Sequence, residues 1–181
     1  CTVVMIPVCS FFPKQVCRPV LRSCDPNDII GPEGPGSENW VRCGQELAYK
    51  VRFENDPERA TAPAQVVEIR HPLDADVDPR TFELGSFGFG DFTFEVPEGR
   101  ASYADRLNVT DSLGVYVDVT AGLDVQANEA FWRFTTIDPE TGSQPTGDPT
   151  AGFLPINDST GRGEGFVRYR VQADSSASTG N

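Results

Sequence analysis

Short runs in which every second residue is apolar most strongly restrict the fold of this chain. The runs Leu47–Phe53, Val115–Val119 and Val167–Val171 all follow this pattern. A period of two is typical of strands that bury one face. No long window keeps apolar residues at helical spacing. The sequence therefore predicts an all-β protein without helices.

Turn-forming residues separate these runs and indicate how many strands there are. Further strands are expected at residues 65–70, 79–84, 87–96, 103–109 and 130–137. Seven or eight short strands with turns rich in Gly and Pro predict an immunoglobulin-like antiparallel β-sandwich over residues 24–181. Within 87–96, Gly88 and Gly90 indicate a bulge that resets the strand register. The proline-rich segment 138–162 is expected to be a structured excursion on the surface.

The first 23 residues differ from the rest, because they combine several cysteines with regularly spaced prolines. We expect a Cys-rich extended arm here, or the end of a preceding module. The start of the chain lacks both an initiator Met and a basic flank, so we interpret the chain as part of a longer protein rather than as one that begins with a signal peptide.

The cysteines favour disulfides over zinc. They are Cys1, Cys9, Cys17, Cys24 and Cys43. Their spacing does not give the paired C-x₂₋₄-C of a structural zinc site. We expect a disulfide between Cys24 and Cys43, which in the chain-entropy model stabilises the fold by about 3 kcal/mol. The odd count leaves one cysteine that pairs outside this chain or stays free.

The charge balance excludes several partners. Asp and Glu number 27 against 15 Lys and Arg, so the net charge is −12. This charge repels nucleic acids and anionic lipids and attracts divalent cations. No apolar run approaches the 18 residues of a membrane span, so no membrane insertion is expected.

Two acid–amide clusters suggest a calcium site. The candidate ligands are Asp25, Asn27 and Asp28 in one loop, and Glu54, Asn55, Asp56 and Glu58 in a second. Calcium takes six to eight oxygen ligands of this kind. The alternative is that these residues form turns, because Asp and Asn side chains bond their own backbone. A third loop, with Asn157, Asp158 and Glu164, also offers oxygen ligands.

Other chemistry is weakly indicated. His71 is the single histidine, and no Gly-x-Ser-x-Gly motif accompanies it, so no catalytic residue is predicted. The Asp74-x-Asp76-x-Asp78 spacing fails as an EF-hand, because Pro79 replaces the required Gly. Asn108 and Asn157 begin glycosylation sequons, which matter if the protein is secreted by a eukaryote.

The order of several motifs carries a resemblance. Asp25-Pro-Asn-Asp-Ile-Ile-Gly-Pro-Glu-Gly, Phe53-Glu-Asn-Asp-Pro-Glu, Ala62-Pro-Ala-Gln-Val-Val, Leu84-Gly-Ser-Phe-Gly-Phe-Gly and Leu154-Pro-Ile-Asn-Asp are among them. Over about residues 24–175 the chain resembles a family of β-sandwich modules from very large secreted and surface-attached proteins, mostly microbial. Its Ala, Arg, Pro and Cys usage is also similar to that of green-algal mastigoneme subunits, fibrous glycoproteins on flagella (cilia). Both resemblances imply a structural module and name no ligand.

We therefore expect a non-enzymatic extracellular or cell-surface module, one unit of a filament or surface glycoprotein. Its partners would be other copies, neighbouring modules or glycans. The alternatives are a calcium-dependent adhesion or carbohydrate-binding domain that uses an exposed Trp40 or Trp132, and an accessory domain of a secreted hydrolase. We also expect the sandwich to lack a strand beside Gly165–Val171. The apolar arm Thr2–Val8 would fill that groove in its own domain or in the next copy.

Overall fold

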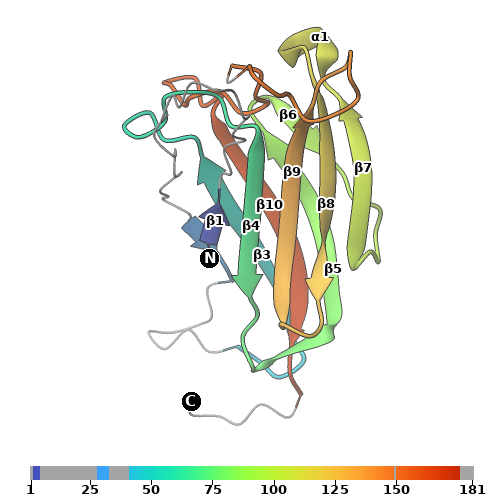
Figure 1. Cartoon of the computed structure of the whole chain (residues 1–181). Coiled ribbons are helices and arrows are strands. Elements are labelled where there is room, and N and C mark those ends of the chain that lie inside the picture. The colour runs from blue at the N-terminus through green and yellow to red at the C-terminus, as the bar shows by residue number, and fades with distance from the viewer. Residues whose placement is uncertain (1, 5–27, 33–40, 149, 176–181) are drawn as a thin grey trace.

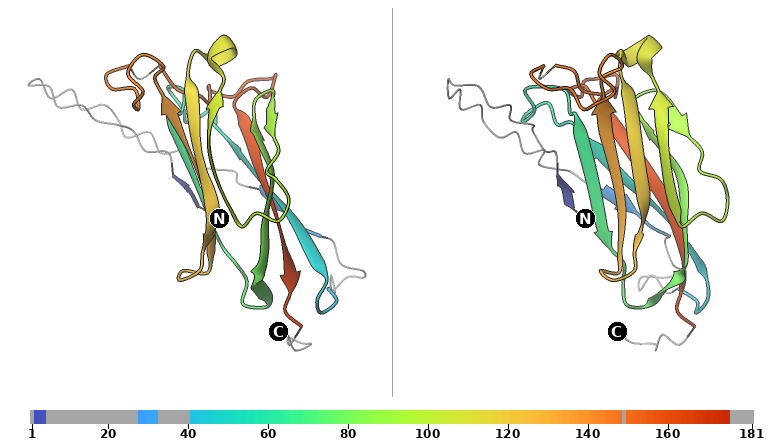
Figure 2. Two further views of the ribbon diagram at one scale, coloured as in Figure 1. Left: turned by 90° about the vertical axis from the view of Figure 1, so that its right-hand side faces the viewer. Right: turned by 45° about the vertical axis from the view of Figure 1, so that its right-hand side comes forward.

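The chain forms two five-stranded antiparallel sheets that pack face to face (Figure 1). The computed structural model describes residues 2–4, 28–32, 41–148 and 150–175. Sheet A contains, in spatial order, β1 (Thr2–Val4), β4 (Val66–Pro72), β9 (Glu129–Ile137), β8 (Tyr116–Asp124) and β7 (Ser102–Asn108). Sheet B contains β2 (Asp28–Ile30), β3 (Glu46–Glu54), β10 (Glu164–Ala173), β5 (Val77–Phe89) and β6 (Phe92–Phe94). The predicted all-β sandwich is confirmed, and Figure 2 shows its two layers from the side.

The order of the strands corresponds to the immunoglobulin fold with one exchange. In that fold, strands A, B, E and D form one sheet and strands C, F and G the other. Here β1, β4, β9 and β8 occupy the first set of positions, while β5 and β10 correspond to C and F. The position beside F, normally taken by the last strand, is held by β3. An early strand of the chain therefore takes the place of the usual final strand, and β2 pairs with its outer side.

This arrangement overturns the expected gap beside the last strand. β10 pairs with β3 along its whole length and with β5 on its other side. It therefore lies in the interior of sheet B and has no free edge. The arm instead pairs with β4 at the edge of sheet A, where Thr2 lies opposite Arg70 and Val4 opposite Glu68. Residues 5–8 of the expected arm strand, and its cysteines, lie outside the described residues.

Aromatic residues fill the space between the sheets. Trp132, Phe87, Phe89 and Phe134 are at most 2% exposed. The Phe87 and Phe134 rings, which come from opposite sheets, lie 5.7 Å apart. Alternation along each strand places these side chains inside, which is why the period-two pattern located the strands correctly. The expected strands at 47–53, 65–70, 103–109, 115–119, 130–137 and 165–171 are all present.

The segment after Phe87 differs from the prediction. β5 continues to Phe89 and turns through Gly90, whose φ is 51°, into β6, so the glycine forms a hairpin rather than a bulge. The shifts in register occur earlier in β5, where it pairs with β10 between Phe87 and Leu84 and again between Glu83 and Asp78. Ser86 lies at the first of these shifts.

Two further expectations are wrong. The described part of the chain contains one short helix, α1 (Thr110–Leu113), which ends at Gly114 in the left-handed region with φ 72°. The segment 138–162 is not confined to the surface, because Phe153 and Leu154 are fully buried at the end of the sandwich that also carries α1 (Figure 1). Leu154 also forms an isolated bridge with Ala64.

Candidate functional site

The described part of the first acid loop pairs within the sheet. Asp28 is the first residue of β2 and lies opposite Arg52 of β3, with which it forms an ion pair. Asp25 and Asn27 lie outside the described residues. Arg52, the partner of Asp28, is two residues before Glu54, the last residue of β3. Asp28 therefore lies near the end of sheet B where the second acid loop begins.

The second acid loop is organised by local hydrogen bonds. The side chain of Asn55 is buried, and its Nδ2 donates to the backbone oxygens of Ala62 and Leu154, each at 3.1 Å. Asp56 Oδ1 accepts from the backbone N–H of Glu58 at 2.8 Å, as in an Asx turn. Within the described ranges no group of three acidic, His or Cys side chains is arranged to hold a metal ion. Calcium binding stays a prediction. The contacts of Asn55 and Asp56 are the side chain–backbone hydrogen bonds that the turn alternative expects.

Asn157 links the third loop to the second. Its Nδ2 donates to Glu54 Oε2 at 2.7 Å and to Glu164 Oε1 at 3.3 Å. Its Oδ1 accepts from the backbone of Asp158 and of Gly163. This side chain holds the loop together, which makes it a poor glycan acceptor. The other sequon residue, Asn108, is exposed at the end of β7, and its Oδ1 accepts from Thr110 at 2.7 Å.

The remaining sequence predictions meet the structure only in part. Cys43 is exposed, but Cys24 lies outside the described residues, so their disulfide stays a prediction. Trp132 is 1% exposed and packs near Tyr169, which overturns the idea that it presents a flat ring to a sugar. Trp40 lies outside the described ranges. No helix in the described part of the chain has the length and apolar character needed to cross a membrane.

A cavity of about 330 Å³ opens between the two sheets at one edge of the sandwich. Sheet B contributes Ile29, Tyr49 and Tyr169, and the end of β4 with its following loop contributes His71 and Asp74. Most of the remaining wall is aliphatic. The Tyr49 and Tyr169 rings stack with their centroids 4.9 Å apart. A largely apolar cavity with a few converging polar groups is the usual form of a small binding site.

His71 is the unusual group in this cavity. Its ring centroid lies 5.7 Å from that of Tyr169, and its Nδ1 is buried without a hydrogen-bond partner among the described residues. Burial lowers the pKa of His71 below its usual value near 6.5, so the ring is neutral at pH 7. Burial raises the pKa of Tyr169, and burial together with the charge of Asp74 raises that of Tyr49. The cavity therefore presents neutral hydrogen-bonding groups and aromatic faces.

The titration of His71 gives a prediction. His71 binds a proton near pH 6.5 in the unfolded chain but only at lower pH in the folded chain. The free energy of unfolding therefore falls as the pH drops below 6.5. Carboxylates such as Asp118, whose pKa is lowered by Arg106, lose their contribution only below about pH 4. Between pH 7 and 5 the melting temperature of the wild type is expected to fall more than that of His71→Gln. Equal slopes in calorimetry would contradict this assignment.

Sequence reasoning missed this cavity because its walls come from five separate strands and a loop. The sequence marks His71 only as the single histidine, and Tyr49 and Tyr169 only as positions on strands. The signal that was available is that Tyr49 and Tyr169 both occur at alternating, inward positions. Their contact could be inferred only once β3 and β10 were known to pair, with Tyr49 opposite Tyr169.

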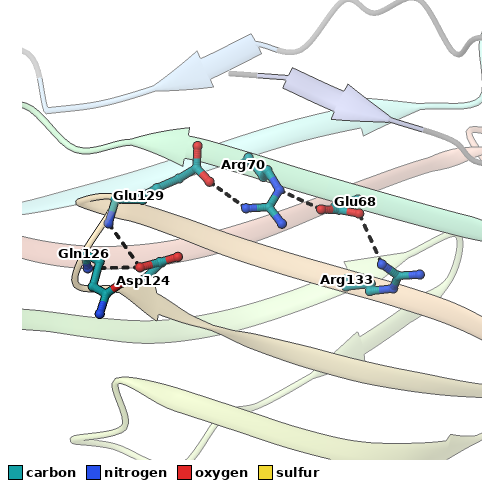
Figure 3. Close-up of polar contacts among 7 residues, drawn as sticks. Glu68, Arg70, Asp124, Gln126, Glu129 and Arg133 are labelled. Atoms are coloured by element: carbon teal, nitrogen blue, oxygen red, sulfur yellow. Dashed lines mark hydrogen bonds and ion pairs between the residues drawn. The ribbon is translucent and has the colours of Figure 1, made fainter.

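The outer face of sheet A carries a network of ion pairs (Figure 3). Arg70 of β4 bonds Glu68 at 2.6 Å and Glu129 at 2.8 Å, while Arg133 of β9 approaches the other oxygen of Glu68 at 3.4 Å. Asp124 accepts the backbone N–H of Gln126 in the β8–β9 turn. Every cation of this network has an acidic partner.

Comparison with known families gives one match. Residues 25–104 match the model of a domain of unknown function, DUF7619. The DUF7619 match contains both acid loops and runs from before β2 into β7, so it covers less than half of the chain and omits β8, β9 and β10. Comparison with curated proteins and with solved structures gives no match.

Proposed function

We propose that the chain is a non-catalytic structural module of a large extracellular fibrous or surface glycoprotein, which spaces neighbouring modules and contacts them through its sheet edges. The observation that carries this proposal is the pairing of β1 with β4. β1 covers only Glu68–Arg70 of a strand that runs from Val66 to Pro72. Edge strands with unpaired backbone groups are templates for pairing with another chain.

The cavity beside the same edge supports this proposal. Its lining includes Ile29 of β2, the outermost described strand of sheet B, and His71 of β4, the strand that pairs with β1 in sheet A. This cavity has room for apolar side chains of an added strand. If the arm of another copy paired with β4 in the way that β1 does, it would join two modules. Exchange of an identical element between copies is a common route to assembly.

Deletion of residues 1–17 tests this function. The truncated chain loses β1 and leaves the edge of β4 unpaired, so we expect its melting temperature to fall by about 2–4 °C, the shift that about 1 kcal/mol produces in a domain of this size. A peptide of residues 1–8 added in excess should restore the loss. A peptide with Val3→Pro should restore less, because proline removes one backbone donor.

Light scattering after gel filtration shows whether the arm pairs with β4 of its own domain or with β4 of a second copy. If the arm joins two copies, we expect the full chain to form oligomers as its concentration rises. The truncated chain should stay monomeric. The proposal fails if the truncated chain is equally stable and the full chain stays monomeric at high concentration.

A further inference from the structure

The outer face of sheet B carries two cations that repel each other. Lys50 of β3 and Arg168 of β10 lie directly opposite in the register, so both side chains project from the same face. Like charges in such a cross-strand pair are destabilising. In a chain with net charge −12, acidic partners are abundant, so a cation pair left without one is unexpected.

The other cations on the strands have acidic partners. Six of the eight Lys and Arg residues on strands form ion pairs, namely Arg52, Arg70, Arg80, Arg106, Arg133 and Arg170. Among the described residues, no carboxylate lies within ion-pairing distance of Lys50 or Arg168. Their neighbours on the same face contrast with them, because Arg52 pairs with Asp28 and Arg170 bonds Glu83 at 2.9 Å. Within the part of the chain that the structure describes, this central pair is the uncompensated one on the strands.

Phe166 and β5 hold the two cations in place. The Phe166 ring lies 4.7 Å from Lys50 Nζ and 5.1 Å from Arg168 Cζ, measured to the ring centroid. Arg168 Nη1 also donates to Ser86 Oγ at 3.3 Å, and Ser86 is only 7% exposed. A side chain at Gly88 would approach the Phe166 ring to within 2.8 Å. The small residue therefore lets the ring lie flat on the sheet.

A cation pair fixed in this way is organised for an anion. Cation–π contacts hold each charge over the ring without neutralising it. The guanidinium retains hydrogen-bond donors for an oxyanion, and a carboxylate or sulfate that bridges Lys50 and Arg168 would relieve their repulsion. Arg52 and Arg170 lie beside the pair on the same two strands, but Asp28 and Glu83 neutralise them. Lys50 and Arg168 therefore carry the positive charge that is left for a ligand.

We propose that the outer face of sheet B binds an acidic polysaccharide, with its carboxylate or sulfate groups held by Lys50 and Arg168. The face is a sheet surface rather than a cleft, which suits an extended polymer. Most exposed side chains near the pair are charged, and the one ring there lies beneath the cations. Ile30 of β2, which lies opposite Lys50 and is 47% exposed, is the single large, exposed apolar side chain beside them among the described residues. Protein–protein interfaces usually centre on apolar anchors and exclude charge from the centre, so an acidic protein fits this face less well.

The test uses defined polymers and the full chain. Polygalacturonate carries carboxylates, dextran sulfate carries sulfates, and neutral dextran is the uncharged control. Polyglutamate and duplex DNA represent acidic protein and nucleic acid. Binding is measured by biolayer interferometry at low and at physiological salt. We expect binding to polygalacturonate or dextran sulfate that weakens with salt, because the contacts are exposed charges.

The variants locate the site. Lys50→Gln combined with Arg168→Gln is expected to weaken binding at least tenfold, and Phe166→Leu to weaken it less by releasing the cations. Arg106→Gln, which removes an exposed cation from sheet A, should bind like the wild type. Melting temperatures close to the wild-type value confirm that each variant is folded.

Three results would overturn the proposal. The first is no binding to either acidic polysaccharide at low salt. The second is equal binding by the double variant and by Arg106→Gln. The third is binding to polyglutamate or DNA as tight as to the polysaccharides and equally dependent on Lys50 and Arg168, since the face would then recognise any polyanion or an acidic protein.

Discussion

Replacing Asn55 by Asp is expected to destabilise the fold by about 3–5 kcal/mol, the range found when a buried charge is left without compensation. The amide of Asn55 is 2% exposed and donates to two backbone oxygens. A carboxylate has no proton to donate at pH 7, so it would face the carbonyls of Ala62 and Leu154 with like partial charge. Urea unfolding of the two chains at pH 7 measures the difference.

The same substitution separates the turn role of Asn55 from the predicted calcium role. An Asn ligand of calcium tolerates replacement by Asp, because the carboxylate supplies the same oxygen and more charge. If Asn55→Asp keeps wild-type stability once calcium is added, or binds calcium more tightly in calorimetry, the donor role is wrong. The control is Asp56→Asn in the same loop, where either side chain can form the turn. That variant should stay within about 0.5 kcal/mol of the wild type.

The sequence predicted the local elements well because they depend on alternation. Leu47, Val51 and Phe53 point inward along β3 as the period of two requires, and each is at most 4% exposed. The same reasoning located β7, β8, β9 and β10. These results rest on neighbours within one strand, where geometry fixes which side chains share a face.

The errors concern contacts between distant segments. Alternation does not reveal that β3 lies beside β10, so a gap was expected at a strand that in fact has two partners. The hydrogen bonds of Asn55 could not be foreseen either, because its partner Leu154 lies 99 residues away. The placement of Lys50 and Arg168, without an acidic partner among the described residues, was equally hidden, since it follows from the register of two strands far apart in sequence.

The segment 138–162 shows the same limit. Its four prolines and its polar residues indicated a surface loop, and most of its residues are indeed exposed. Pro145, Phe153 and Leu154 are the buried exceptions, and the last two turn inward and cover the end of the core. Two apolar residues in a polar segment carry no period, so neither strand nor helix patterns mark them as buried.

Phe153→Ala is therefore expected to cost about 3–5 kcal/mol, the range for a buried aromatic residue. The Phe153 ring is fully buried, with its centroid 5.0 Å from that of Phe89 and 6.0 Å from that of Phe134. Its backbone N–H donates to the buried hydroxyl of Thr136 at 3.1 Å, which fixes the segment where the ring enters the core. Removing the ring leaves a cavity between the sheets that this rigid frame fills poorly.

Phe166→Ala is the matched control, because it makes the same chemical change on the outer face of sheet B. Its ring is only partly buried, so we expect less than half the loss seen at Phe153, in proportion to the apolar area removed from water. Phe153→Leu should recover part of the stability by refilling the cavity. Equal losses at the two positions, or a loss at Phe153 below about 1 kcal/mol, would show that the segment 138–162 lies on the sandwich without completing its core.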